Sequence, residues 1–399
     1  MKKNTILLAL SALMSLSAVA ENQPFLTKVY DFLPAPGQFV NTMPDAEVGD
    51  AKESILKRVE EAICGRYEEN DWGQMEMLYK PGMISLGSYG GYVVVGFDHP
   101  VVNVKGDYDF QIFGNAFLAD QYSSGGSSEP GIVMVSYDVN GNGLPDDPWY
   151  ELAGSEYNSP KTQHNYTITY YKPDENKVKT PDPNNKSIID NTYIRWTSND
   201  VNPDSVSGYV YKNSFHAQSY WPQWAEGETI TFTGSKLCNN ATDTSGKGTY
   251  WVQWNKGWGY VDNRPDYDPY SPRTDLDSAA MNRGFKIDWA VDANGVPVHL
   301  PMVHFIKVHN AVNQYCGWIG ETSTEVAGGI DFHPNQALPE VTAGDTNGDG
   351  VVDVSDVTAV VNFILGQKPI GYNPVAVDVN GDGIVDVTDV TALINLILK

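Results

Sequence analysis

Two copies of one acidic loop near the end of the chain constrain its fold more than any other feature of the sequence. The copies are DTNGDGVVDVSD at residues 345–356 and DVNGDGIVDVTD at residues 378–389. In both, oxygen-bearing side chains occupy positions 1, 3, 5, 9 and 12, and glycine occupies position 6. A hard cation such as Ca²⁺ needs about six to eight oxygen ligands, and the glycine permits the sharp turn that gathers them. The repeat therefore predicts two calcium sites.

The position of each residue in the loop predicts its role, and the backbone carbonyl of position 7 completes each set of side-chain oxygens. The predicted ligands of the first ion are Asp345, Asn347, Asp349, the Val351 carbonyl, Asp353 and Asp356. The predicted ligands of the second ion are Asp378, Asn380, Asp382, the Ile384 carbonyl, Asp386 and Asp389. The alternative is a degenerate loop, in which turn chemistry alone explains the Asp, Asn and Gly content.

The charge of this segment indicates that its folding depends on the metal. Residues 343–399 contain eight aspartates against two lysines, Lys368 and Lys399, which leaves a formal charge of −6. Without calcium the carboxylates repel one another, and a small segment has little core to resist that repulsion. Metal binding and folding are therefore expected to be coupled.

Aspartate stands at position 12 in both loops, and each loop is followed directly by an apolar helical pattern, at residues 357–365 and 390–398, with no helix before it. This pattern resembles the type I dockerins over residues 343–398. The resemblance implies docking to a cohesin on a scaffold or cell surface, as part of machinery that degrades polysaccharides.

One departure from the dockerin pattern concerns the partner surface. The helix positions that often carry Lys or Arg for cohesin contact are Val361 and Asn362 in the first copy and Ile394 and Asn395 in the second. The expected partner face is therefore more apolar than in other dockerins. A cohesin of another type, a contact with the protein's own large domain, and a role as a secretion signal all stay open.

The beginning of the chain has the features of a secretory signal peptide over residues 1–20. Lys2 and Lys3 precede an apolar run, and Ala18-Val19-Ala20 forms a small-residue cleavage site. The run is too short to span a bilayer, and no second apolar stretch of about 18 residues predicts a transmembrane segment. No cysteine at the cleavage point offers a lipid anchor, so we expect a secreted or cell-surface-associated protein. Its formal charge of −24 argues against a nucleic-acid partner.

Between the signal peptide and the calcium module, residues 21–334 are expected to form a mainly β domain, followed by a linker at residues 335–342. Short runs rich in Val, Ile, Tyr and Phe alternate with Gly, Asn, Asp and Pro, which is the pattern of strands and turns. Strands are predicted at residues 91–97, 108–113, 131–136, 167–171, 229–232, 250–254 and 302–308, and one helix at residues 45–64. Antiparallel strands without intervening helices favour a sandwich, specifically a jelly-roll or galactose-binding-like fold.

A third acidic loop lies inside this domain. Asp138, Asn140, Asn142, the Leu144 carbonyl and Asp146 reproduce the beginning of a calcium loop, with Glu151 or Asp147 available to close it. The spacing departs from twelve residues at the closing ligand. The loop is therefore either a third calcium site or a hairpin turn without metal.

Aromatic residues are dense between residues 220 and 258. Exposed Trp and Tyr rings stack on the apolar faces of sugars while neighbouring polar groups bond to the hydroxyls. The alternative is that most of these rings belong to the core. The candidate ligand-binding residues are Trp221, Trp224, Trp251, Trp254 and Trp258.

The large domain also resembles secreted cell-surface proteins of gut Bacteroidetes over residues 35–333. The resemblance rests on Ser85–Gly91, Phe110–Phe117, Glu129–Gly131 and Cys316–Glu325. It implies a compartment and a sandwich fold, and it carries over no catalytic residues. The three cysteines, Cys64, Cys238 and Cys316, allow at most one disulfide.

Three functions are compatible with the sequence. The first is a non-catalytic glycan-binding or adhesion protein displayed through its dockerin. The second is a glycoside hydrolase, although the many acids do not single out a catalytic pair, and neither an H-E-x-x-H nor a G-x-S-x-G motif occurs. The third is a surface capture protein for another nutrient, such as a corrinoid.

Overall fold

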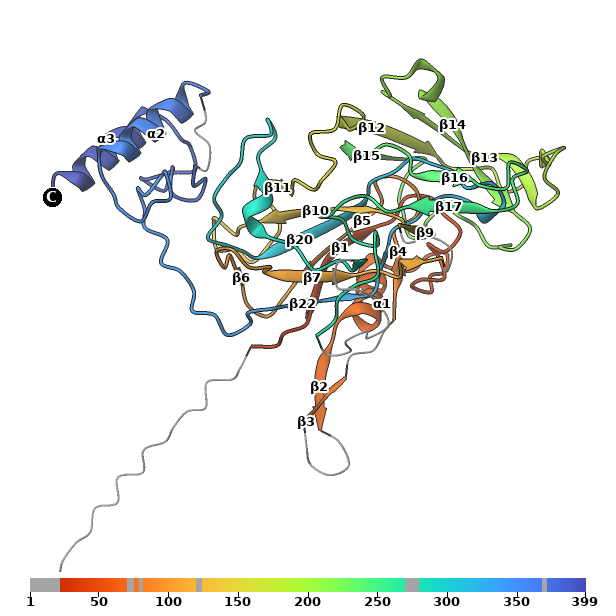
Figure 1. Ribbon diagram of the computed structural model, residues 1–399, viewed down its shortest axis with the longest axis horizontal. Coiled ribbons are helices and arrows are strands. Elements are labelled where there is room, and N and C mark those ends of the chain that lie inside the picture. The colour runs from red at the N-terminus through yellow and green to blue at the C-terminus, as the bar shows by residue number, and fades with distance from the viewer. Residues whose placement is uncertain (1–21, 70–74, 79–81, 120–123, 270–279, 368–371) are drawn as a thin grey trace, which may run out of the picture.

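The computed structural model describes residues 22–69, 75–78, 82–119, 124–269, 280–367 and 372–399 (Figure 1). The predicted signal peptide lies outside these ranges. Among the described residues, no helix combines the length and apolar character needed to cross a membrane.

The centre of the large domain is a six-stranded antiparallel sheet (Figure 1). Four of its strands are buried over almost their whole length. In spatial order the strands are β1 (Lys28–Leu33), β5 (Tyr92–Gly96), β20 (Phe305–Asn310), β10 (Gly131–Ser136), β11 (Trp149–Leu152) and β18 (Ala290–Val291).

Short two-stranded ribbons and helix α1 (Lys52–Ile63) cover one face of this sheet. The ribbons are β4 (Ile84–Ser85) with β21 (Glu325–Val326), β6 (Val101–Val102) with β19 (Met302–Val303), and β7 (Phe110–Phe113) with β22 (Gly328–Asp331). Ile55 and Val59 of α1 pack in one core with Val93 of β5 and Ile112 of β7. This arrangement makes a sandwich with the main core between its layers. A further ribbon pairs β2 (Arg66–Glu69) with β3 (Met75–Leu78).

Two four-stranded antiparallel sheets extend the domain. One contains β14 (Ser207–Asn213), β13 (Ile188–Ser198), β12 (Gln163–Tyr171) and β15 (Thr229–Lys236). It has a second, tyrosine-rich core that includes Tyr89, Tyr166, Tyr170 and Tyr220. The other contains β16 (Ala241–Asp243), β17 (Trp251–Trp254), β9 (Gly125–Ser127) and β8 (Phe117–Leu118).

The C-terminal module contains two helices, α2 (Val354–Ile364) and α3 (Val387–Ile397), at the end of the molecule opposite the β12–β15 sheet (Figure 1). Each begins three residues before the predicted start. The reason is a capping box at the beginning of each helix. The side chains of Asp353 and Asp386 cap the two helices, and the side chains of Asp356 and Asp389 accept hydrogen bonds from the backbone N–H groups of these capping residues. The prediction of a mainly β chain with a small helical C-terminal module is confirmed.

Two predicted elements of the large domain differ from the structure in ways that side-chain contacts explain. Helix α1 begins at Lys52 and not at residue 45, because residues 45–50 form turns in which Asp50 accepts hydrogen bonds from the Glu47 N–H and from Arg58. The strand predicted over residues 302–308 is interrupted at His304, whose Nδ1 accepts a hydrogen bond from the backbone N–H of Asp138 (3.1 Å). The division into domains at residues 334 and 343 stays a prediction.

Candidate calcium loops and ligand pockets

The three acidic loops share one hydrogen-bonding pattern. In the first, Asp345 accepts bonds from the N–H groups of Asp349 (3.1 Å) and Gly350 (3.0 Å), Asn347 accepts from Asp349 (2.9 Å), and Asp349 accepts from Val351 (2.9 Å). The second loop repeats these bonds at the corresponding positions. The side-chain oxygens at positions 1, 3 and 5 are therefore already oriented by hydrogen bonds from the backbone N–H groups of the loop.

Position 12 is the most buried part of each C-terminal loop. Asp356 is fully buried and accepts from the N–H groups of Thr346 (2.8 Å), Asn347 (3.1 Å) and Asp353 (2.8 Å). Asp389 is also fully buried but accepts from only two such groups, at Asn380 (3.1 Å) and Asp386 (2.9 Å). Each carboxylate ties the beginning of its loop to the beginning of the following helix.

The glycines at position 6 are required by backbone conformation. Gly350 and Gly383 have φ values of +86° and +84°, and a Cβ at either position would contact nothing within 4 Å. The need for glycine therefore comes from the left-handed angle and not from crowding. A donor set made only of oxygens, with carboxylates in the majority, suits Ca²⁺. The residues present thus fit the metal that the repeat predicts, and Asp353 and Asp386, the predicted ligands at position 9, also cap the two helices.

The loop at residues 138–147, called the Asp138 loop below, has the same pattern. Asp138 accepts from the N–H groups of Asn142 (3.1 Å) and Gly143 (2.8 Å), Asn140 accepts from Asn142 (2.9 Å), and Asn142 accepts from Leu144 (2.7 Å). Gly143 has a φ of +72°, like its counterparts. Asp146 accepts from the Asn142 side-chain amide (3.0 Å).

The structure places the two candidate closing residues of this loop in different surroundings. Glu151 lies in β11, where its carboxylate accepts a hydrogen bond from Ser235 of β15 (2.6 Å) and faces a pocket on that side of the sheet. Asp147 accepts a bond from the Val139 N–H (3.2 Å), and its pKa is raised by burial and by the charges of Asp138 and Asp146. Asp147 is therefore the acid that belongs to the loop.

The C-terminal module packs on the large domain through Tyr372. This residue is 2 % exposed, its ring packs against Phe363 of α2 (5.3 Å between centroids), and its carbonyl accepts the His299 N–H (2.9 Å). Its hydroxyl donates to Asp292 (3.3 Å). This contact does not use the predicted partner face, where Val361 and Ile394 stay exposed.

The five candidate tryptophans do not form one surface. Trp221 is 3 % exposed in the tyrosine-rich core, and Trp224 is partly buried with one face stacked on Phe32 (5.7 Å between centroids). Trp254 packs over Gly125, on the opposite face of β17 from Trp251. Trp258 is half-exposed and packs against Trp289 (4.5 Å) in a pocket of its own.

Trp251 lines a pocket of about 550 Å³ that is rich in aromatic side chains, called the Trp251 pocket below. Its rings come from segments far apart in the sequence. Phe215 and Trp318 meet edge to face (6.0 Å), and so do Phe39 and His216 (4.6 Å). The lining side chains are Gln38, Phe39, Phe117, Ala119, Ser127, Asn213, Phe215, His216, Tyr250, Trp251, Val252, Gln253, Trp318 and Ile319.

Several rings at this pocket are unusually open. Phe117, Phe215, Tyr250 and Trp318 are each at least 40 % exposed. An exposed aromatic group of this kind marks a binding surface more often than a solvated one. Burial lowers the pKa of His216, so its imidazole is neutral near pH 7.

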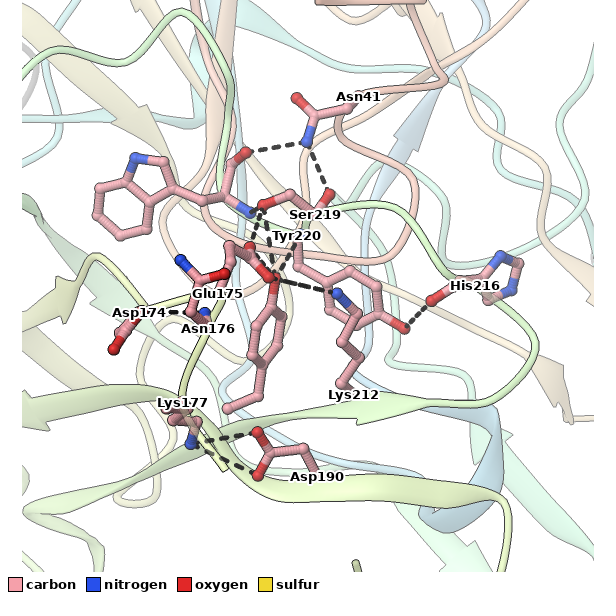
Figure 2. A network of polar contacts seen from close by, with 12 residues as sticks. Asn41, Asp174, Glu175, Asn176, Lys177, Asp190, Lys212, His216, Ser219 and Tyr220 are labelled. Atoms are coloured by element: carbon pink, nitrogen blue, oxygen red, sulfur yellow. Dashed lines mark hydrogen bonds and ion pairs between the residues drawn. The ribbon is translucent and has the colours of Figure 1, made fainter. Parts of the chain in front are cut away.

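A polar network holds the wall of the pocket formed by residues 213–219 (Figure 2). Asn213 accepts from the backbone N–H groups of Phe215 and His216 (both 3.0 Å), which holds the backbone that carries the two rings. Behind them Glu175 accepts from Ser219 (2.7 Å) and lies 3.5 Å from the ammonium of the buried Lys212. This wall is therefore held by charge and hydrogen bonds from the neighbouring sheet.

Three carboxylates gather beneath the pocket. Oxygens of Glu129, Asp262 and Glu325 lie within 4.8 Å of one another; Glu129 is partly exposed and the other two are buried. Burial raises the pKa of all three, and the neighbouring charge of Glu129 adds to the rise for Asp262 and Glu325. The link to the pocket runs through Gln253, which donates to Glu129 (3.1 Å). Among the lining residues that the structure describes, none is an acid.

The three cysteines are free thiols. Burial raises the pKa of Cys64 and of Cys316 to about 12, so neither is a nucleophile at neutral pH. Cys238 accepts a bond from the Lys256 ammonium (3.0 Å).

Comparison with known proteins gives one family. Residues 343–398 match the model of the dockerin type I domain, over the segment whose loops and helices are described above. No curated protein matches the chain. The match supports a calcium-binding module that interacts with a cohesin-type partner.

Proposed function

Starting from the type I dockerin domain at residues 343–398, we propose that this protein is an exported, non-catalytic glycan-binding component of polysaccharide-utilisation machinery. The dockerin attaches it to a cohesin-type partner, and the Trp251 pocket binds the sugar. The observation that carries the proposal is the pocket itself, in which open aromatic rings stand beside neutral polar side chains.

The pocket has the two chemical elements that sugar recognition needs. Rings such as Trp251 and Trp318 offer faces for the C–H groups of a pyranose, and Gln38, Asn213 and Gln253 offer amides for its hydroxyls. A glycosidase requires two carboxylates on either side of the scissile bond. The lining residues that the structure describes include no carboxylate, which favours glycan binding over glycoside hydrolysis.

The proposed protein binds three calcium ions. Two ions occupy the dockerin loops, and a third occupies the Asp138 loop, with Asp147 in place of Glu151. The third site is supported by its hydrogen bonds, which match those of the dockerin loops from position 1 to position 5. It has a structural role, because it holds the turn between β10 and β11.

A second candidate function is the capture of a corrinoid, and His216 favours it. A neutral imidazole is the form of histidine that ligates metals, and His216 lies in a pocket whose walls are mostly aromatic. A planar macrocycle with a central cobalt would place its ring against those walls.

Affinity electrophoresis of the full mature chain in calcium, through gels that contain a panel of plant and host polysaccharides, tests the first function. Retardation by one polymer without release of reducing ends is the expected result. Retardation with cleavage would establish the hydrolase. No retardation, together with quenching of tryptophan fluorescence by a corrinoid, would establish the second candidate.

A further inference from the structure

Glu151 faces a pocket of about 210 Å³ between β11, β12 and β15, called the Glu151 pocket below. It is separate from the Trp251 pocket, with which it shares no lining residue. The side chains that matter for its chemistry are Trp149, Glu151, Tyr157, His164, Ser235 and Asp292.

One oxygen of the Glu151 carboxylate is held and the other is available. Oε2 accepts the Ser235 hydroxyl (2.6 Å), whereas no residue that the structure describes donates to Oε1. Burial raises the pKa of Glu151 to about 7. A carboxylate in this position is stabilised by any cation that enters the pocket.

His164 holds Ser235 in place. Its Nδ1 lies 2.9 Å from the Ser235 oxygen, and its Nε2 lies 3.2 Å from the carbonyl oxygen of Tyr157. The ring of His164 also packs against Tyr157 (4.5 Å). The imidazole therefore orients the carboxylate through the serine.

The remaining walls distinguish an organic cation from a metal ion. Calcium needs about six to eight oxygens, but Glu151 and Asp292 are the only acids among the described lining residues. Trp149 and Tyr157 supply π-faces, which attract ammonium groups.

No lysine or arginine stands among the described lining residues, so neither occupies the available oxygen of Glu151. We propose that the Glu151 pocket binds an organic ammonium ion, with Glu151 as its counter-ion and Trp149 and Tyr157 as its aromatic walls. The ligand class is a small alkylammonium, primary or quaternary. Asp292 adds negative charge at the far side and connects the pocket to Tyr372 of the dockerin.

The test is isothermal titration calorimetry of the full mature chain in saturating calcium, with choline chloride as the probe. The neutral isostere 3,3-dimethylbutan-1-ol and sodium chloride of equal ionic strength are the reference titrants. Choline is expected to bind and the neutral alcohol to bind at least about tenfold more weakly, since only the cation gains from the carboxylate and the rings.

Variants locate the site. Glu151→Gln should weaken choline binding about tenfold or more, whereas Glu156→Gln, in the neighbouring loop and outside the lining, should leave it unchanged. Trp149→Leu should weaken binding and Trp149→Phe should retain most of it, which keeps the test valid if Glu151→Gln fails to fold. Three results would each overturn the proposal: equal binding of the alcohol, full choline affinity in Glu151→Gln, or no choline binding up to about 10 mM. A cation held by one carboxylate and two rings should give measurable binding at that concentration.

Discussion

Replacing Asp356 by alanine is the sharpest test of how the dockerin folds. The carboxylate accepts three backbone N–H groups, at 2.8, 3.1 and 2.8 Å, in a fully buried position, and it occupies position 12 of the predicted calcium loop. Hydrogen bonds to a charged group each stabilise a protein by about 1.5–3 kcal/mol, and bonds to one group are not additive. We therefore expect the substitution to cost about 3–5 kcal/mol, before any loss of metal binding.

The second loop supplies a matched comparison. Asp389 accepts two backbone N–H groups where Asp356 accepts three, because residue 379 makes no bond equivalent to that of Thr346. Asp389→Ala should accordingly cost less than Asp356→Ala. Thr358→Ala, on the exposed face of α2, should change stability by no more than about 0.5 kcal/mol.

The assay is a calcium titration of the full chain, followed by calorimetry and by far-ultraviolet circular dichroism. The wild type should take up calcium and gain helix together. Asp356→Ala should lose most of that gain, and Asp389→Ala a smaller part. Unchanged calcium uptake in Asp356→Ala, or a larger loss in Asp389→Ala, would refute the reasoning.

Three further predictions concern the large domain and its contact with the dockerin. Tyr372→Ala should detach the module, since its ring and hydroxyl make the contact; more rapid proteolysis between residues 334 and 345 is the expected sign, and unchanged cleavage would count against it. Asp138→Ala should reduce the calcium stoichiometry of the full chain from three to two, as measured by calorimetry, whereas Glu151→Gln should leave it at three. Burial raises the pKa of Glu321 from 4.5 to about 7, so the folded state binds this proton more tightly. Protonated Glu321 then contributes about 1–3 kcal/mol to the free energy of unfolding. This contribution is complete below about pH 4.5 and is lost as the pH rises through about 7. Glu321→Gln should flatten that decline in thermal denaturation from pH 5 to 8, and an unchanged slope would disprove it.

Local patterns predicted the dockerin well, because the information lies within twelve residues. Ligand positions 1, 3 and 5 and the left-handed glycine at position 6 follow from the order of residues in one loop. Local patterns did not distinguish Glu151 from Asp147 as the residue that closes the Asp138 loop. Pairing of β11 with β10 and the contact with Ser235 of β15 turn this side chain away from the Asp138 loop, and no sequence spacing records that contact.

The Trp251 pocket could not be predicted from local sequence patterns. It joins β8, β9 and β17 to residues 213–219 and to Trp318, which are separated by long stretches of chain. The density of tryptophans between residues 220 and 258 pointed to Trp251, but it also pointed to Trp221, which the tyrosine-rich core buries. Alternation along β17 could have separated Trp251 from Trp254, whereas Phe215 and Trp318 needed the tertiary structure.

The most direct test of the proposed function compares Trp251→Ala with Trp258→Ala by affinity electrophoresis, in calcium, through the polysaccharide that retards the wild type. Both rings are partly exposed, but they lie in different pockets. Loss of retardation in Trp251→Ala, with full retardation in Trp258→Ala, is the result that binding in the Trp251 pocket predicts. Full retardation in Trp251→Ala would contradict it and place the sugar elsewhere on the protein.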